Sequence, residues 1–126
     1  MSPRDWTLRV QDILEAIEKI QLYTRDATQE SLRVDARTVD AVVRNLTVIG
    51  EATRHVPSEI QQRYPAIPWD DMRDMRNVVV HEYFRISYPI LWRTIQSNLP
   101  PLVEQLNELL RQAEQDKQDD VPGTLR

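Results

Sequence analysis

The chain has 126 residues, of which 40% are hydrophobic, and it carries a formal net charge of -4 at pH 7. This length favours one domain, and the acidic balance argues against non-specific binding along nucleic acid, which depends on neutralising phosphates. The sequence contains no cysteine, so disulfide bonds and thiolate chemistry are excluded. No run approaches the roughly 20 apolar residues that span a bilayer, and we therefore expect a cytoplasmic protein without membrane contact.

Apolar residues recur with helical spacing along nearly the whole chain. The first stripe runs from Val10 to Ile20, behind a helix start at Ser2-Pro3. A polar link over residues 24–33 precedes the second stripe, from Val39 to Ile49. The further helical segments are expected to begin at Ser58, to span Trp69 to about Phe84, to begin at Ser87-Pro89, and to cover Leu102 to Ala113.

Two sequence signals define helix boundaries in the second half of the chain. Ser58-Glu59-Ile60-Gln61 has the form of a capping box, in which the first and fourth side chains satisfy each other's backbone N–H groups. Pro100-Pro101 should kink or break the helix that Ser87 opens, because proline lacks a backbone donor.

These segments predict an all-α, up-and-down bundle of about five helices, with antiparallel neighbours across short connections. Residues 1–113 should form the helical domain. Residues 114–126 are polar, lack periodicity and contain Pro-Gly, which predicts a frayed or disordered tail. Small helical domains often enlarge their core by pairing with a second copy, so we expect a homodimer.

Candidate chemistry is concentrated in one stretch, "MRNVVVHEYF", from Met75 to Phe84. His81 can move protons near neutral pH, and Arg76 offers a permanent charge and a forked donor set for a phosphate. Asn77 could orient the backbone or the histidine. Tyr83 adds a side chain whose ring could stack on a base and whose hydroxyl could be modified. These residue types suit RNA cleavage without a metal ion, in which the RNA's own 2'-hydroxyl attacks phosphorus.

Helical geometry places a condition on this site. Arg76 and Tyr83 are seven residues apart and share a face, whereas Arg76 and His81 are five apart and point about 140° away from each other. Both could act on one phosphate if the helix is distorted near His81, or if two copies face each other across a dimer axis. A local basic cleft is compatible with the acidic net charge, because five arginines recur here: Arg63, Arg73, Arg76, Arg85 and Arg93.

A structural interpretation of the same residues stays open. A lone histidine near a helix end often binds a backbone carbonyl, and Arg76 could pair with a nearby acid (Asp70, Asp71 or Asp74). No metal site and no cofactor are expected, because His55 and His81 lack the spacing of a zinc helix. His55 is interpreted as structural, at a helix C-terminus.

Further positions are expected to support the stretch. Gly50 lies inside a helix, where glycine costs about 1 kcal/mol relative to alanine, and close helix packing would explain it. Glu51 could reach the cleft and orient Arg76 or His81, or could be an ordinary solvated carboxylate. Trp69, Met72 and Val80 are interpreted as residues of the core or of a dimer interface.

At this point the sequence resembles the HepT-like toxins of the HEPN superfamily. The motif of that family, an arginine, a short spacer, a histidine and then a tyrosine, stands here as Arg76-Asn77-Val78-Val79-Val80-His81-Glu82-Tyr83. Three further blocks are similar in order and spacing: "DAVVRNLTVIGEATRHVP", "IPWDDMRDMRNVVVHEYFRIS" and "LWRTIQSNLPPLVEQL". Glu82 departs from the glycine of many members; it could weaken RNA binding, tune His81, or only replace a flexible residue on a solvated turn.

The resemblance implies the toxin of a type II/VII-like toxin–antitoxin pair: a homodimer, or a higher oligomer, with a composite cleft in which Arg76 and His81 of both chains meet. The implied activity is metal-independent endoribonuclease cleavage of tRNA or mRNA. The implied partner is a nucleotidyltransferase-fold antitoxin that can transfer AMP from ATP to Tyr83. A second interpretation also stays open, in which the protein is a non-catalytic helical module that binds the nucleotidyltransferase and is modified by it.

Overall fold

The computed structural model describes residues 5–77 and 86–119, and over these residues the chain is helical and contains no strand. This confirms the predicted all-α fold, while the homodimer stays a prediction. None of the described helices is long and apolar enough to cross a membrane. The described elements are α1 (Asp5–Tyr23), α2 (Gln29–Leu32), α3 (Ala36–Arg54), α4 (Ser58–Arg63), α5 (Trp69–Asp74), α7 (Tyr88–Arg93), the π-helical segment η1 (Thr94–Asn98) and α8 (Leu99–Asp119).

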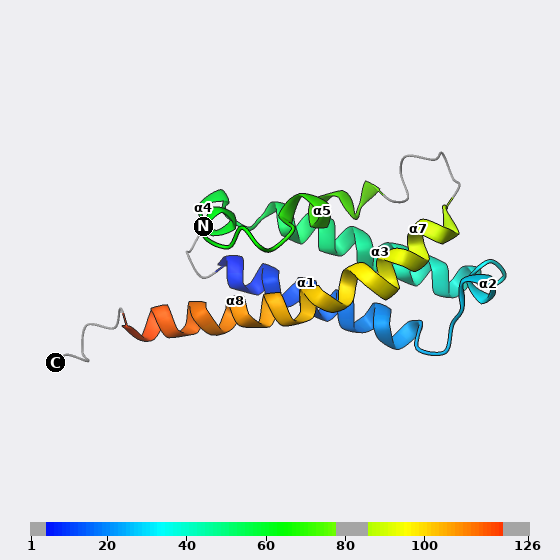
Figure 1. Ribbon diagram of the computed structural model, residues 1–126, viewed down its shortest axis with the longest axis horizontal. Helices are drawn as coiled ribbons and strands as arrows, with labels where there is room; N and C mark the ends of the chain where they lie inside the picture. The colour runs from blue at the N-terminus through cyan, green and yellow to red at the C-terminus, as the bar shows by residue number, and fades with distance from the viewer. Residues whose placement is uncertain (1–4, 78–85, 120–126) are drawn as a thin grey trace.

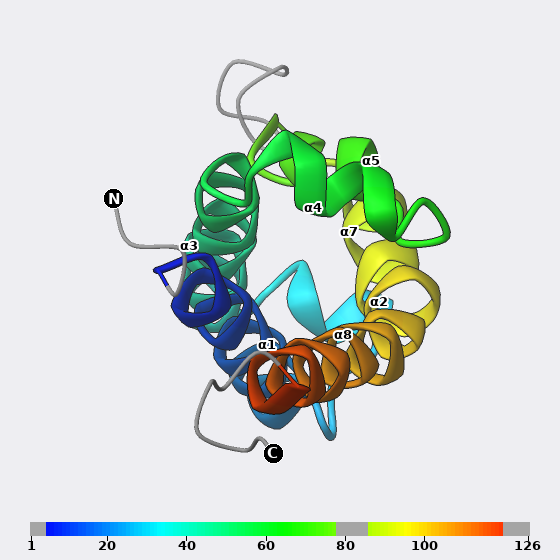
Figure 2. The ribbon, with the colours of Figure 1, turned by 90° about the vertical axis from the view of Figure 1, so that its left-hand side faces the viewer.

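The helices surround one core, with α1 and α5 running in one direction and α3 and the α7–η1–α8 run in the other (Figures 1 and 2). α1 packs along α3, α3 packs against α5, and α8 returns beside α1. The apolar stripes predicted from the sequence supply the contacts, because the side chains that recur every three or four residues are those that the neighbouring helices cover. The largest fully buried side chains among the described residues are Ile13, Ile17, Ile20, Leu32, Leu46, Ile49, Met72, Leu91, Leu99, Leu102, Leu106 and Leu109.

The paired prolines distort a helix instead of ending it. α7 passes through η1 into α8 without interruption, and the N–H of Leu99 donates to the carbonyl of Thr94, five residues earlier. A π turn just before Pro100-Pro101 relieves the clash that each proline ring makes with the preceding turn. Ser87 begins this helical run as predicted, and its hydroxyl accepts the N–H of Ile90.

Two predicted boundaries differ from the structure. Ser58 is the first residue of α4 and not its cap; Pro57 holds the cap position and no side chain caps the helix, so the predicted capping box is wrong. The side chain of Gln61, expected to close that box, bonds instead to groups outside α4. The polar link over residues 24–33 contains a short helix, α2, which a capping box between Thr28 and Ser31 begins.

The last helix extends beyond the predicted end of the domain at residue 113. α8 continues to Asp119, so residues 114–119 are its last turns, and residues 120–126 lie outside the described part of the chain. Glutamate, glutamine and lysine favour helices even without an apolar stripe, which explains why the loss of periodicity did not mark a helix end. Arg63 also reaches α8, with its Nη2 3.2 Å from Oδ2 of Asp116.

Candidate active site

Arg76 lies at a turn directly after α5. The helix ends at Asp74, and the N–H of Met75 donates to the carbonyl of Met72. The predicted single helix from Trp69 to about Phe84 is therefore interrupted at residues 75–76, earlier than the distortion considered near His81. Tyr83 lies outside the described residues, so the facing relation between Arg76 and Tyr83 stays a prediction.

Gly50 allows the backbone of this turn to lie against α3. A Cβ atom at Gly50 would lie 2.9 Å from the carbonyl oxygen of Arg73 and 3.0 Å from both the backbone nitrogen and Cβ of Arg76. Real Cβ atoms rarely approach other heavy atoms so closely, so glycine is required by contact and not by its torsion angles. This confirms the close packing predicted for Gly50, and it shows that the backbones of Arg73 and of the motif arginine, Arg76, lie against it.

The side chain of Arg76 turns toward α3 and meets Glu51, the residue after Gly50. Arg76 Nη1 lies 2.5 Å from Glu51 Oε1, and Arg54 Nη1 lies 3.6 Å from the same oxygen. The three side chains are 40%, 44% and 56% exposed, respectively. Glu51 thus makes the contact with Arg76 that the sequence suggested, and the arginine is held at the surface where a ligand can reach it.

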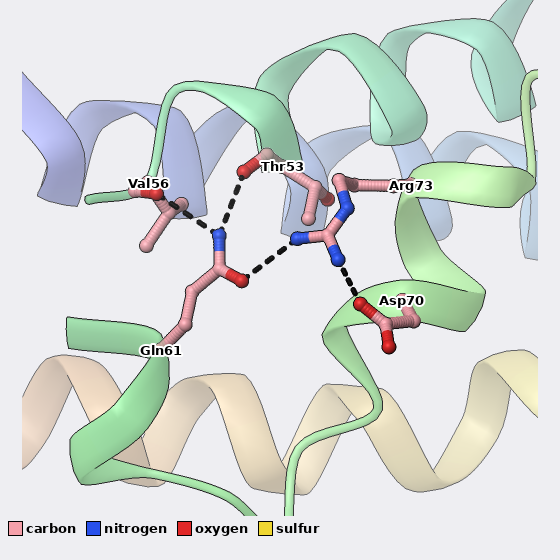
Figure 3. Close-up of polar contacts among 5 residues, drawn as sticks. All are labelled: Thr53, Val56, Gln61, Asp70 and Arg73. Carbon is pink, nitrogen blue, oxygen red and sulfur yellow. Dashed lines mark hydrogen bonds and ion pairs between the residues drawn. The ribbon is translucent and has the colours of Figure 1, made fainter. Parts of the chain in front are cut away.

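Arg73, three residues earlier, is held in a different environment (Figure 3). Its Nη1 donates to Gln61 Oε1 at 2.8 Å, and its Nη2 pairs with Asp70. The Gln61 amide nitrogen donates in turn to the carbonyl of Val56 at 3.0 Å and to that of Thr53 at 3.5 Å. The Thr53 carbonyl lies in the last turn of α3, and that of Val56 lies two residues beyond the end of the helix. One glutamine therefore ties α3 and α4 to α5.

The apolar residues around this network fix α5 on the core. Trp69 is 6% exposed and Met72 is fully buried, which confirms both as core residues. The indole N–H of Trp69 donates to the carbonyl of Tyr64 at 3.0 Å, which anchors the first residue of α5. The position of Arg76 thus depends on the buried Trp69 of the preceding helix, α5, and on the contact of its own turn with Gly50 of α3.

The acids expected to compete for Arg76 lie elsewhere. Asp70 pairs with Arg73, whereas Asp71 and Asp74 line a groove of about 560 Å³ between α5 and the α7–α8 run. Met75 and Ile90 also line this groove. Its carboxylates would repel a phosphate, so the groove does not suit an RNA backbone.

The remaining predicted site residues are only partly placed. Asn77 is half-buried directly after Arg76. His81, Glu82 and Tyr83 lie outside the described residues, as does Val80. His55 is the exposed C-cap of α3, in agreement with its structural interpretation.

The sequence did not indicate the contacts of three residues around Arg76. Gln61 and Arg73 connect elements that only the tertiary structure brings together, so no local pattern indicates them. Arg54 could have been found, because it follows Glu51 by three residues on a helix and such pairs share a face.

Comparison with known proteins assigns the chain to a family. The profile described as "Ribonuclease HepT-like" matches residues 13–109. The chain belongs to the HepT-like ribonuclease family. The match includes α3, α5 and the turn that carries Arg76, and it confirms both the family predicted from the motif and, at this level, the assignment as a ribonuclease.

Individual relatives support the same assignment. The "Probable ribonuclease HepT" of Thermococcus cleftensis is 37% identical over 100 residues, which cover 79% of this chain and 91% of the relative. A "Putative RNase" of Methanocaldococcus jannaschii is 31% identical over 121 residues, covering 96% of this chain and the whole of the relative. Another protein of that organism, "Gamma-glutamylcyclotransferase and putative RNase", is 30% identical over 114 residues, and the match spans only 51% of its length. No solved structure matches the chain.

Proposed function

We propose that this HepT-like protein is the toxin of a toxin–antitoxin pair and that it cleaves RNA without a metal ion. The observation that supports this most directly is the state of Arg76: the motif arginine is half-exposed, its backbone is packed on Gly50, and its guanidinium is oriented by Glu51. Arg73, by contrast, engages both of its terminal nitrogens, with Nη1 on Gln61 and Nη2 on Asp70, whereas Arg76 contacts Glu51 through Nη1.

The proposed reaction is an internal transesterification followed by product release. The RNA 2'-oxygen attacks the adjacent phosphorus, and His81 accepts the proton from the hydroxyl group. The bond from phosphorus to the 5'-oxygen of the next nucleotide breaks, and this oxygen takes up a proton from the protonated His81 or from water, which yields a 2',3'-cyclic phosphate and a 5'-hydroxyl end. Arg76 stabilises the negative charge that develops on the phosphate oxygens. The roles of Asn77 and Glu51 are to orient these two groups.

The proposal includes two partners. A second copy of the chain would complete the cleft by bringing its own Arg76 and His81 to the same RNA. A nucleotidyltransferase-fold antitoxin would inactivate the toxin by transferring AMP to Tyr83. An added phosphate close to Arg76 would pair with the guanidinium that should bind the RNA phosphate, and its negative charge would repel the substrate.

A cleavage assay in EDTA tests the catalytic part of this proposal. The purified protein, shown by mass to be unmodified, is incubated with total tRNA, and new RNA ends are mapped. Cuts with 5'-hydroxyl ends should persist in EDTA and should fall at least about 100-fold, the usual contribution of one acid–base group, in Arg76→Ala and His81→Ala. Arg111→Ala is the matched control, because Arg111 pairs with Glu108 on α8.

Three results would contradict the proposal. Cuts that vanish in EDTA would refute metal independence. Cuts that remain in both variants would come from a contaminant. A folded, unmodified protein that cleaves neither tRNA nor mRNA, yet binds the nucleotidyltransferase tightly and is modified on Tyr83, would be a binding module instead of an enzyme.

A further inference from the structure

Glu51 differs from the other ion-paired carboxylates in the described part of the chain because two arginines share it. Arg76 and Arg54 both approach its Oε1. The other pairs each join one acid to one base, so their charges cancel: Arg9–Asp12, Lys19–Glu15, Arg63–Asp116, Arg73–Asp70 and Arg111–Glu108. The cluster of Arg54, Glu51 and Arg76 therefore carries a net charge of +1 on a protein whose overall charge is negative.

The geometry keeps this positive charge available to a ligand. Because both guanidinium groups contact one oxygen, they lie side by side on the surface formed by the end of α3 and the turn after α5. At 3.6 Å, Arg54 is within ion-pair distance of Glu51 but beyond a good hydrogen bond. Arg54 is also the most exposed of the three side chains, at 56%. It keeps donors free for an anion, whereas Arg73 is engaged with Gln61 and Asp70.

The surroundings indicate which anion would fit. The groove on the other side of α5 presents Asp71 and Asp74 and would repel phosphates. A polyanion that places one phosphate on Arg76 is therefore directed along the α3 side, where Arg54 comes next. Two neighbouring guanidinium groups suit successive phosphates of a single strand, because arginine binds phosphate oxygens through paired donors.

We infer that Arg54 is a second phosphate-binding residue, which holds the RNA backbone phosphate next to the one that Arg76 contacts. Glu51 sets the spacing of the two arginines and limits their combined charge. This inference rests on the proposed function, since it assigns a binding role beside the same catalytic arginine. Arg54 touches the substrate away from the reacting phosphorus, so its loss should weaken binding without slowing the chemical step.

The test measures RNA binding and cleavage separately. Binding is followed by fluorescence anisotropy of a labelled 2'-O-methyl RNA oligonucleotide, which lacks the attacking hydroxyl and stays intact, at several salt concentrations. Arg54→Ala should raise the Kd on the order of tenfold at low salt and should reduce the slope of log Kd against log salt by roughly 0.7, the value for one phosphate of a single strand. In the cleavage assay, KM should rise while kcat stays unchanged.

Matched variants distinguish this role from a general loss of positive charge. Arg54→Lys should recover most of the binding, because it keeps the charge. Arg111→Ala removes an exposed arginine from an acid–base pair on α8 and should leave both the Kd and the slope unchanged. Glu51→Gln raises the charge of the cluster by one and should tighten binding of the uncleavable RNA.

The outcomes separate this inference from the proposed function. The inference is wrong if Arg54→Ala matches Arg111→Ala in Kd and in salt dependence, or if it lowers kcat instead of raising KM. Neither result contradicts the proposed ribonuclease activity. If the wild-type protein binds the oligonucleotide with the expected dependence on Arg54 but cleaves no RNA, the catalytic proposal fails and the phosphate site remains. A wild-type protein that does not bind the oligonucleotide overturns the inference.

Discussion

The two ends of α3 are fixed in different ways. At the N-terminal end, Asp35 caps its own helix: Oδ1 accepts the N–H of Thr38 at 3.1 Å and Oδ2 accepts its hydroxyl at 2.7 Å. At the C-terminal end, other elements add their own contacts to the local backbone bonds. Gln61 of α4 donates to the carbonyls of Thr53 and Val56, and the turn carrying Arg76 lies directly on Gly50.

The difference explains why the candidate site lies at one end of this helix. A cap between Asp35 and Thr38 orders only the segment that contains both residues. A contact such as Glu51 with Arg76, which joins residues 25 apart in sequence, fixes one element relative to another. Catalytic geometry needs the second kind of contact, because small displacements of a reacting group are costly. The predictions below test this comparison from the largest expected effect to the smallest.

Gly50→Ala should disrupt the C-terminal end most strongly. Alanine favours a helix by about 1 kcal/mol over glycine, yet the added Cβ would meet the backbone oxygen of Arg73 at 2.9 Å and the backbone nitrogen of Arg76 at 3.0 Å. Because the close contacts are with backbone atoms, we expect a cost near the upper end of the about 1–3 kcal/mol typical of overpacking, which leaves a net loss of about 2 kcal/mol in the free energy of unfolding. RNA cleavage should fall as well, since Arg76 must move. Urea denaturation and the cleavage assay measure the two effects.

Thr47→Ala is the control for this substitution, because Thr47 is exposed on the same helix. Its unfolding free energy should change by no more than about 0.5 kcal/mol, and its cleavage rate should not change. A gain in stability for Gly50→Ala, of the size that helix propensity alone provides, would show that the turn is not held against α3.

Gln61→Ala should have the next largest effect. The substitution removes the amide that joins the carbonyls of Val56 and Thr53 to Arg73. We expect a loss of about 1–2 kcal/mol, the usual cost of leaving partly buried polar groups without partners. Gln62→Ala is the matched control: it changes the same residue type on the same helix at an exposed position. Equal urea midpoints for the two variants would refute the bridging role of Gln61.

The same two ends show what the sequence could and could not predict. The stripe from Val39 to Ile49 is an intrinsic pattern, and its residues pack into the core or against it. The packing of Gly50 was predictable because glycine destabilises the interior of a helix, so its presence there indicates a close contact that a side chain would block. The contact of Glu51 with Arg76 was also suggested, since both lie beside the predicted cleft.

What the sequence did not predict depends on contacts between elements. Ser58 and Gln61 match a capping box, but the Gln61 side chain bonds instead to Arg73 and to the carbonyl of Val56. The interruption at Met75 follows from the approach of this turn to Gly50, which no local pattern encodes. In both cases a tertiary contact overrides a local preference.

The smallest effect is expected at the N-terminal end. Hydrogen bonds from the side chain and backbone of Thr38 lower the pKa of Asp35 from its ordinary value of 3.8. The folded state therefore favours the carboxylate, so this cap stabilises the fold fully at pH values above 3.8 and loses its effect as the pH falls through the lowered folded pKa. Asp35→Ala should melt slightly below the wild type at neutral pH, and this difference should narrow under acid conditions.

Asp35→Asn keeps the cap but removes its charge, because the asparagine oxygen can accept the N–H of Thr38, its amide nitrogen can donate to the Thr38 hydroxyl, and the side chain does not titrate. The melting difference between Asp35→Asn and Asp35→Ala should therefore be independent of pH. A gap between wild type and Asp35→Ala that stays constant in acid would refute a charge-dependent cap.

Cleavage per folded molecule should be the same in Asp35→Ala and wild type, measured at a temperature where both are fully folded. Asp35 precedes Gly50 by 15 residues, or about 22 Å along the helix axis, and its cap bonds reach no further than Thr38. Loosening that end lowers stability without moving Arg76, whereas Gly50→Ala at the other end should reduce both stability and cleavage. A loss of cleavage in Asp35→Ala would mean that α3 transmits disorder along its whole length, and the distinction between its two ends would fail.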